Sequence, residues 1–156
     1  MKQELDKLLC EKYPKMMVNR NKSMMETTMY WGFECGDGWY NIIDQLMGNI
    51  QHHIYWKERQ REVAIRFNSK AASGEMREVP EEISQVTVDQ VKEKFGTLRF
   101  YYTGGDDYID GLVSMAESMS GVTCETCGNP GKSTGGGWIK TVCEAHSGRK
   151  NNDENS

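Results

Sequence analysis

Residues 91–120 have the sequence VKEKFGTLRFYYTGGDDYIDGLVSMAESMS, and the hydrophobic period of this stretch changes part-way along it. Up to residue 103 the side chains alternate and are rich in β-branched and aromatic types, which is typical of strands. Gly96 interrupts this run and predicts a tight turn between two strands, the first of which begins near residue 85. After Gly105 the apolar residues recur every three or four positions, which predicts a helix. Two strands followed directly by a helix predict a mixed α+β fold.

The junction between the second strand and this helix also contains candidate ligand-binding residues. Leu98, Phe100 and Tyr102 should share one face of the strand, and the alternate side chains should share the other. The glycines relieve strain at the chain reversal, and an Asp should cap the first turn of the helix. An Arg and aromatic rings beside a helix start could accept a planar or anionic ligand, although an ordinary solvated sheet face is the alternative interpretation. The candidate residues are Arg99, Tyr101, Gly104, Gly105, Asp106 and Tyr108.

A longer helix is predicted on the N-terminal side of this stretch, from Trp39 onward, with Asp37 as its N-cap. Its apolar residues recur at three- and four-residue steps and mark one buried face that runs to about Trp56 or beyond. The residues of this face are Ile42, Ile43, Leu46, Met47, Ile50 and Ile54. A shorter amphipathic helix is predicted over residues 2–13, where Pro14 stops it.

The remaining segments of the first two thirds are less regular. Residues 14–36 are rich in Met, which we interpret as filler for irregular gaps in the core, because Met is flexible. Residues 57–70 carry five basic and two acidic side chains. We interpret them as a solvated face or a helix end, with a patch for an anion or an acidic partner as the alternative. Residues 68–84 contain Gly74 and Pro80 among small and charged residues, which predicts a surface loop.

Near the C-terminus the sequence contains a C-x2-C pair, a gap of 15 residues and a C-x2-H pair. Each pair has the spacing of a zinc knuckle, and the gap is long enough for a hairpin that brings the two pairs together. Three thiolates and one imidazole would make a closed tetrahedral shell, which is the structural type of zinc site. The predicted zinc ligands are Cys124, Cys127, Cys143 and His146.

A closed shell leaves no coordination position for a substrate or an activated water, so it favours a structural role for the zinc over a catalytic one. If His146 were not a ligand, the site would open and metal-assisted hydrolysis would become an alternative. The sequence contains few other signals of catalysis. Cys35 lies beside a predicted helix start, but the sequence supplies no base for it, so we expect a buried, inert thiol. His52 and His53 are expected to be surface or hydrogen-bonded histidines on the long helix.

Composition and charge narrow the classes of function. The chain has 156 residues and a formal net charge of −4, whereas nucleic-acid binders usually carry a basic surplus, so nucleic acid is an unlikely partner. No apolar run approaches the ~18 residues that a membrane span needs, so we expect no membrane association. The charged N-terminal stretch has no apolar core of a signal peptide, and three of the five Cys have ligand spacing. These features favour a reducing cytoplasm.

Three blocks of the sequence resemble a family of short proteins encoded by tailed phages and prophages. The blocks are ECGDGWYNIIDQL (34–46), the stretch 91–120 quoted above, and CETCGNPG…GWIKTVCEAH (124–146). The resemblance implies a setting in the cytoplasm of a bacterial host during infection. It implies no activity and no catalytic residues. Small non-structural proteins of this kind commonly bind a host or defence component.

Together these features predict two main helices on a short antiparallel sheet, extended by a C-terminal zinc ribbon. The expected organisation is an α+β core over residues 1–120, a zinc-ribbon module over residues 121–147, and a disordered tail over residues 148–156. The predicted function is non-catalytic: the protein binds a host macromolecule and inhibits a defence or regulatory factor. The alternatives are a protein that sequesters a small anionic ligand such as a nucleotide signal, and a metal-assisted hydrolase. DNA binding would require residues 57–70 to share a face with Lys92, Lys94 and Lys132.

Overall fold

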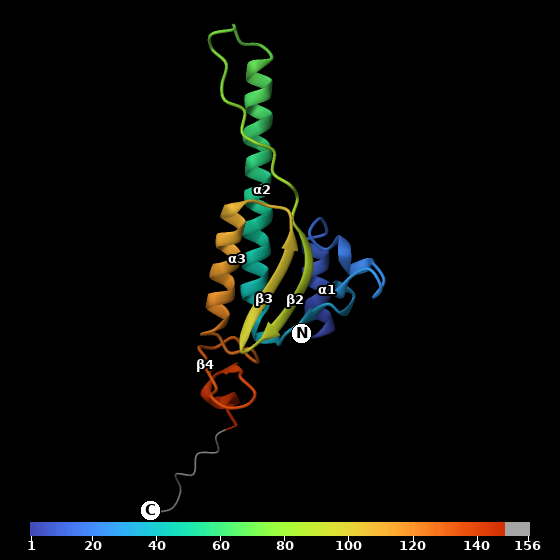
Figure 1. Cartoon of the computed structure of the whole chain (residues 1–156), viewed down its shortest axis with the longest axis vertical. Helices are drawn as coiled ribbons and strands as arrows, with labels where there is room; N and C mark the ends of the chain where they lie inside the picture. Colours follow the sequence, from blue (N-terminus) through green and yellow to red (C-terminus); the bar gives the residue numbers. More distant parts are fainter. Residues whose placement is uncertain (149–156) are drawn as a thin grey trace, which may run out of the picture.

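The computed structural model describes residues 1–148, which form three helices and two small sheets (Figure 1). The helices are α1 (Gln3–Lys12), α2 (Tyr40–Asn68) and α3 (Asp107–Ser120). The main sheet contains β1 (Phe33–Glu34), β2 (Thr87–Lys94) and β3 (Thr97–Thr103), and the second sheet pairs β4 (Lys132–Ser133) with β5 (Thr141–Val142). Short 3-10 helices are η1 (Val18–Asn21), η2 (Thr28–Trp31), η3 (Asp37–Trp39) and η4 (Glu144–His146). The prediction of a mixed α+β fold is confirmed.

The predicted hairpin is formed by β2 and β3, with β2 as the central strand of the main sheet. Phe95 and Gly96 make its turn with φ angles of 52° and 80°, a pair of positive values that suits the twist of a two-residue hairpin. Strand β1 adds to the other edge of β2 in parallel, with Phe33 opposite Val91. The sheet is therefore mixed, whereas the sequence predicted an antiparallel one. The segment around β1 lacks the alternation that reveals a strand, because only two of its residues pair.

One hydrophobic core lies between the sheet and the helices, since α3 packs on both α2 and β3 (Figure 1). Leu98 and Phe100 are buried on the inner face of β3, whereas Tyr101 is exposed on the outer face, so the predicted alternation is confirmed. The six residues predicted for the apolar face of α2 are all buried, but Trp56, where this face was expected to end, is 52% exposed. The other large core side chains include Leu9, Met16, Met29, Trp39, Val86, Val88 and Ile109.

Three details of the sequence-based prediction need correction. Asp37 does not cap α2; it accepts a hydrogen bond of 2.7 Å from the backbone N–H of Lys2, the residue that precedes α1. Met24 and Met25 are exposed at the tip of a loop, while the other Met residues of that segment fill the core as expected. Met115 is one of the apolar residues whose period predicted α3, but it is 65% exposed, because the sheet and α2 cover only a narrow stripe of this short helix.

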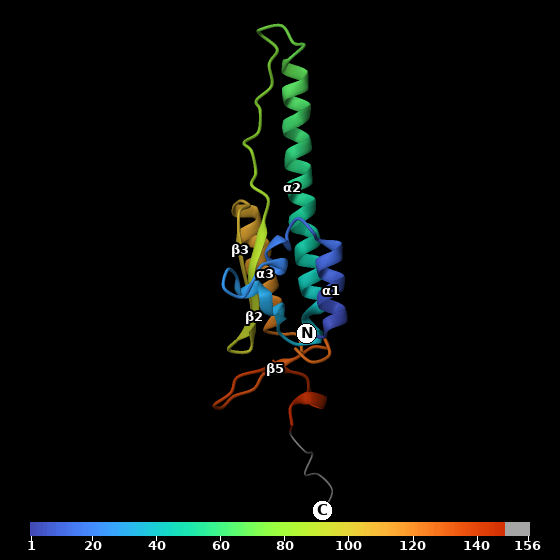
Figure 2. The same ribbon diagram turned by 90° about the vertical axis from the view of Figure 1, so that its right-hand side faces the viewer.

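The outer half of α2 extends beyond the core, and the chain returns alongside it (Figures 1 and 2). The returning segment has no helix or strand, as predicted for residues 68–84. Asn68 bonds to the backbone of Arg77 through both amide atoms at 2.8 Å, and the Arg61 guanidinium donates to the Pro80 carbonyl at 2.6 Å. We call residues 55–80 the arm. The C-terminal Cys/His segment lies at the opposite end of the molecule, and all of the predicted disordered tail beyond Gly148 lies outside the described residues.

Candidate functional site

The four predicted metal ligands come together at one point. Their ligand atoms all lie within 4.8 Å of one another in Cys124, Cys127, Cys143 and His146. The Nδ1 atom of His146 is 3.1 Å from the Cys143 sulfur and 3.7 Å from the Cys124 sulfur, and the sulfurs of Cys127 and Cys143 are 3.7 Å apart. A tetrahedral zinc with bonds of about 2.3 Å to sulfur separates its sulfur ligands by about 3.8 Å. The residues present therefore fit a tetrahedral metal ion.

Local backbone structure places each pair of ligands. The N–H of Gly128 donates to the Cys124 carbonyl at 2.8 Å, which closes the first knuckle with a φ of 81° that favours glycine. In the second pair, the N–H of His146 donates to the Cys143 carbonyl at 3.0 Å and starts η4. The pairing of β4 with β5 folds the intervening residues back and brings the two turns together. The sequence spacing therefore predicted both the clustering of these four residues and the hairpin between the two pairs.

The electrostatics of the cluster favour one thiolate before a metal binds. Burial opposes ionisation of the Cys124 thiol, but backbone N–H groups of Cys143, Cys127 and Thr126 donate to its sulfur and lower its pKa to about 6. A backbone N–H also acts to lower the pKa of Cys127, but desolvation and the nearby thiols outweigh it and raise that pKa. A divalent cation would compensate the negative charge that three thiolates gather here.

The first knuckle is attached directly to the core. The N–H groups of Gly36 and Gly38 donate to the carboxylate and the carbonyl of Glu125 at 2.9 and 2.8 Å. The indole N–H of Trp39 donates to the Thr123 carbonyl at 2.9 Å. These bonds join positions more than 80 residues apart in the sequence. They place the loop before α2 directly against the metal cluster.

Two glycines are required for this contact because the two backbones touch. A Cβ atom on Gly38 would lie 2.2 Å from the Cys124 carbonyl oxygen and 2.6 Å from the Gly128 nitrogen. A Cβ atom on Gly36 would lie 2.2 Å from the Glu125 carbonyl oxygen. Sequence reasoning missed this role and assigned the loop to capping α2. The sequence shows only two glycines around Asp37, and it does not reveal which backbone they contact.

The six candidate ligand-binding residues lie on two surfaces. Arg99 and Tyr101 are on the outer face of β3, where the Arg99 guanidinium donates to Thr97 Oγ1 at 2.7 Å and Lys92 Nζ lies 5.8 Å from the Tyr101 ring centre. Asp106 and Tyr108 begin α3, which covers the other face of the sheet. Gly104 and Gly105 connect the two with φ angles of 90° and 84°.

Asp106 and Tyr108 meet a residue that the sequence did not associate with them. The ring of His53 on α2 stacks on Tyr108 with 4.3 Å between ring centres, and its Nε2 atom is 2.8 Å from Asp106 Oδ2. The other carboxylate oxygen of Asp106 accepts from the Ile109 N–H at 3.2 Å, so the predicted Asp cap of this helix is confirmed. The cluster joins α2 to α3. The contact between His53 and Asp106 could not be found from the sequence, since the two residues are 53 positions apart.

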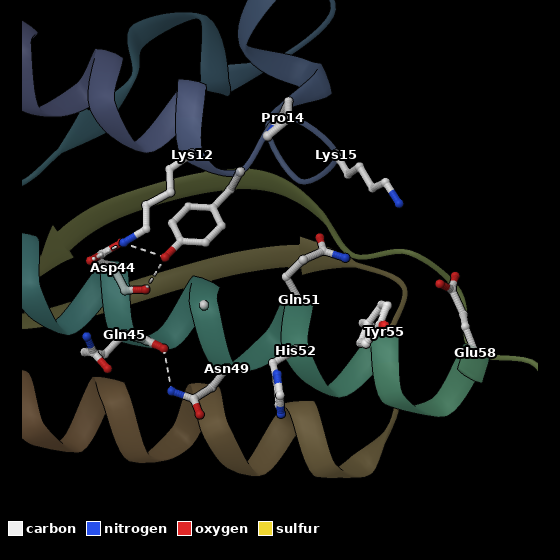
Figure 3. Close-up of a pocket in the computed structure, with 12 residues that line it drawn as sticks. Lys12, Pro14, Lys15, Asp44, Gln45, Asn49, Gln51, His52, Tyr55 and Glu58 are labelled. Atoms are coloured by element: carbon white, nitrogen blue, oxygen red, sulfur yellow. Dashed lines mark hydrogen bonds and ion pairs between the residues drawn. The ribbon is translucent and has the colours of Figure 1, made fainter. Parts of the chain in front are cut away.

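A groove of about 930 Å³ lies between the end of α1 and α2 (Figure 3). At its edge Lys12 Nζ is 2.8 Å from an Asp44 carboxylate oxygen, and the Tyr13 hydroxyl donates to the same carboxylate at 2.6 Å. Asn49 donates to the Gln45 carbonyl one turn away at 2.7 Å. Lys12, Tyr13 and Asp44 thus bond to one another, and Gln45 bonds to Asn49. These five residues do not include a nucleophile paired with a base.

The two remaining Cys residues are not poised for chemistry. Burial is the main cause that raises the pKa of Cys35 to about 12 and that of Cys10 to about 11, so both thiols stay protonated at neutral pH. This agrees with the predicted inert role of Cys35.

Comparison of the chain with protein-family models, with curated proteins and with solved structures gave no match. Within residues 1–148, no helix is both long enough and apolar enough to span a bilayer. The site must therefore be interpreted from its own geometry.

Proposed function

We propose that Cys124, Cys127, Cys143 and His146 bind one zinc ion in a closed structural site, and that residues 121–147 form a zinc-ribbon module. The observation that supports this most directly is the distance of at most 4.8 Å among four ligand atoms. Three thiols and an imidazole select zinc over harder cations. The zinc would hold the two knuckles in the shape that fits the Gly36–Gly38 loop.

We further propose that the protein acts by binding another macromolecule and carries out no catalysis. A metal with four protein ligands has no position for a substrate or water. A hydrolase would need one ligand fewer, but the Nδ1 atom of His146 lies within 3.7 Å of two cluster sulfurs and can take the fourth position. The resemblance to phage proteins supplies the proposed setting: the cytoplasm of a bacterial host, with a host defence or regulatory factor as the inhibited partner.

The test combines metal analysis with recovery of partners by the full-length, tagged chain from phage-infected bacteria. Wild-type protein should contain one zinc per chain and retain a specific host protein. Cys124→Ser should lose zinc and unfold the module. Cys10→Ser is the matched control, because Cys10 lies outside the cluster, and it should behave like the wild type. A folded Cys124→Ser protein with its zinc retained would refute the metal site, and wild-type protein that retains no partner would refute the binding function.

A further inference from the structure

The arm carries an apolar stripe that residues 1–148 leave partly exposed. Trp56, Val63 and Phe67 lie seven and four residues apart, so they share one side of α2. Their exposed fractions are 52%, 48% and 36%. The last α2 residue in the hydrophobic core of the described chain is Ile54, so this stripe begins where the core ends.

The returning segment turns this stripe into a groove. Two hollows of about 400 and 450 Å³ adjoin along the arm, and Val63 and Arg77 line both of them. Pro80 closes the side of the first hollow, and the Arg77 guanidinium lies 4.0 Å from the centre of the Phe67 ring in the second. We call this feature the arm groove. Its length of more than three helical turns suits another helix, because helix-in-groove recognition uses anchors at such spacings.

The rim of the arm groove is basic, although the chain as a whole has a net charge of −4. Four basic and two acidic side chains line it, which gives a local charge of +2. Arg59 is paired with Glu62 at 3.1 Å, whereas the exposed Arg66 side chain has no carboxylate within ion-pair distance among residues 1–148. The lining charges are Arg59, Arg66, Lys70, Arg77, Glu75 and Glu78.

The basic charge of the rim distinguishes between the kinds of partner that could bind in this apolar groove. A second copy of the chain would bring two basic rims together, which like-charge repulsion opposes. A nucleic acid would need a continuous basic track, but carboxylates interrupt this rim. Lys92 and Lys94 end β2 beside the hairpin turn, at the end of the sheet that points away from the arm (Figure 1), so they add nothing to its rim. An apolar floor with basic edges is instead complementary to an amphipathic segment with acidic flanks.

We propose that the arm groove binds an acidic amphipathic helix of a partner protein. Apolar residues of that helix occupy the two hollows beside Trp56, Val63 and Phe67, and its carboxylates face Arg66 and Lys70. The proposal rests on the binding function proposed above and specifies the chemistry of the partner.

The test is a fluorescence-anisotropy titration of the full-length, metal-loaded chain with designed peptides. The probe is a helical peptide of about 18 residues, roughly five turns, with Leu along one face and Glu on the others. It should bind at least about tenfold more tightly than a scrambled peptide of the same composition or a version with Lys in place of Glu. A labelled single-stranded oligonucleotide should not bind. Added salt should weaken the binding of the acidic peptide.

The variant Arg66→Glu should reduce affinity for the acidic peptide about tenfold, because it reverses a charge at the rim without touching the core. Lys7→Glu is the matched control on α1 and should leave affinity unchanged, since the Lys7 side chain is 75% exposed and far from the arm. Equal binding of the scrambled or Lys peptide, preference for the oligonucleotide, or an unaffected Arg66→Glu variant would each overturn the proposal. If the acidic peptide does not bind while wild-type protein still retains a host protein, the proposal for the arm groove is refuted. The proposed binding function is then unaffected.

Discussion

At the scale of single residues, the contact between Gly38 and the metal cluster explains why the loop before α2 contains two glycines. The spacing of the four ligands was sufficient to predict the cluster, because each Cys or His pair acts through its own local turn. The role of Gly38 could not be predicted in the same way. Its neighbour is the backbone of Cys124, which tertiary packing alone brings within reach.

Gly38→Ala should destabilise the folded protein by roughly 1–3 kcal/mol, since the new methyl group overlaps fixed backbone atoms. Gly111→Ala is the matched control, because a Cβ there meets nothing within 4 Å and Gly111 lies inside α3. That control should stabilise the protein by up to about 1 kcal/mol through helix propensity. Denaturant unfolding of both variants measures these changes. Equal effects of the two substitutions would show that Gly38 does not touch the cluster.

Asp106 gives a prediction about pH. Burial opposes its ionisation, but hydrogen bonds from His53 and the Ile109 N–H outweigh burial and lower its pKa below the ordinary value of 3.8. A carboxyl with a lowered folded-state pKa stabilises the fold above its unfolded pKa, and this stability is lost as the pH falls through the folded value. Asp106→Asn should therefore cost up to about 1 kcal/mol near pH 7, and less below about pH 4.

Asp107→Asn provides the matched control for Asp106→Asn. It removes one negative charge from the same helix start without affecting the bond to His53. Its effect on the free energy of unfolding should be small at every pH. A loss in Asp106→Asn that does not change with pH would contradict the role given to the carboxylate.

At the scale of elements, α2 shows where prediction from the sequence works and where it ends. The apolar stripe predicted the helix as far as Trp56, because every buried turn repeats the period. Beyond that residue the core-facing positions become polar: Arg61 and Asn68 bond to the returning segment and replace core contacts. The three- and four-residue period of apolar side chains therefore no longer indicates a helix in this part of the chain, although α2 continues to Asn68. Strand β1 escaped prediction for a similar reason, since its two residues carry no pattern.

The arm should be dispensable for folding. The hydrophobic core of the described residues has no member between Ile54 and Ile83. Replacing residues 59–78 by a short Gly/Ser linker should therefore change the free energy of unfolding by no more than about 1 kcal/mol, because loop-closure costs vary slowly with length. Ile50→Ala should cost about 2–5 kcal/mol in the same assay, since Ile50 is fully buried. Loss of cooperative unfolding in the arm-deleted protein would contradict the conclusion that the arm is not needed for folding.

At the scale of the whole molecule, the two ends differ in what holds them together. The hairpin, α2 and α3 share one apolar core in the middle. Residues 121–147 have few buried apolar side chains, so the proposed zinc would replace the core that so short a segment cannot form. In the arm, side-chain hydrogen bonds of Arg61 and Asn68 to backbone groups of Pro80 and Arg77 join α2 to the returning segment. The sequence predicted the Cys/His cluster at one end because its two pairs have a fixed spacing, whereas the groove at the other end depends on tertiary contacts.

Removal of the metal should loosen one end of the molecule only. Treatment with a strong chelator should increase amide hydrogen exchange in residues 121–147 and in the Gly36–Gly38 loop, whose N–H groups lose their acceptors on Glu125. Strands β2 and β3 should keep their protection, because the hydrophobic core that covers them contains none of the four proposed ligands. Exchange measured by mass spectrometry with and without chelator checks this, and uniform loss of protection across the chain would contradict it.

The central claim is that a four-ligand zinc site fastens residues 121–147 to the core. X-ray absorption spectroscopy of the purified, full-length protein tests it most directly. The account predicts one zinc per chain with three sulfur ligands at about 2.3 Å and one nitrogen ligand at about 2.0–2.1 Å. A folded protein without metal, or a zinc shell that contains a water oxygen in place of the His146 nitrogen, would contradict it.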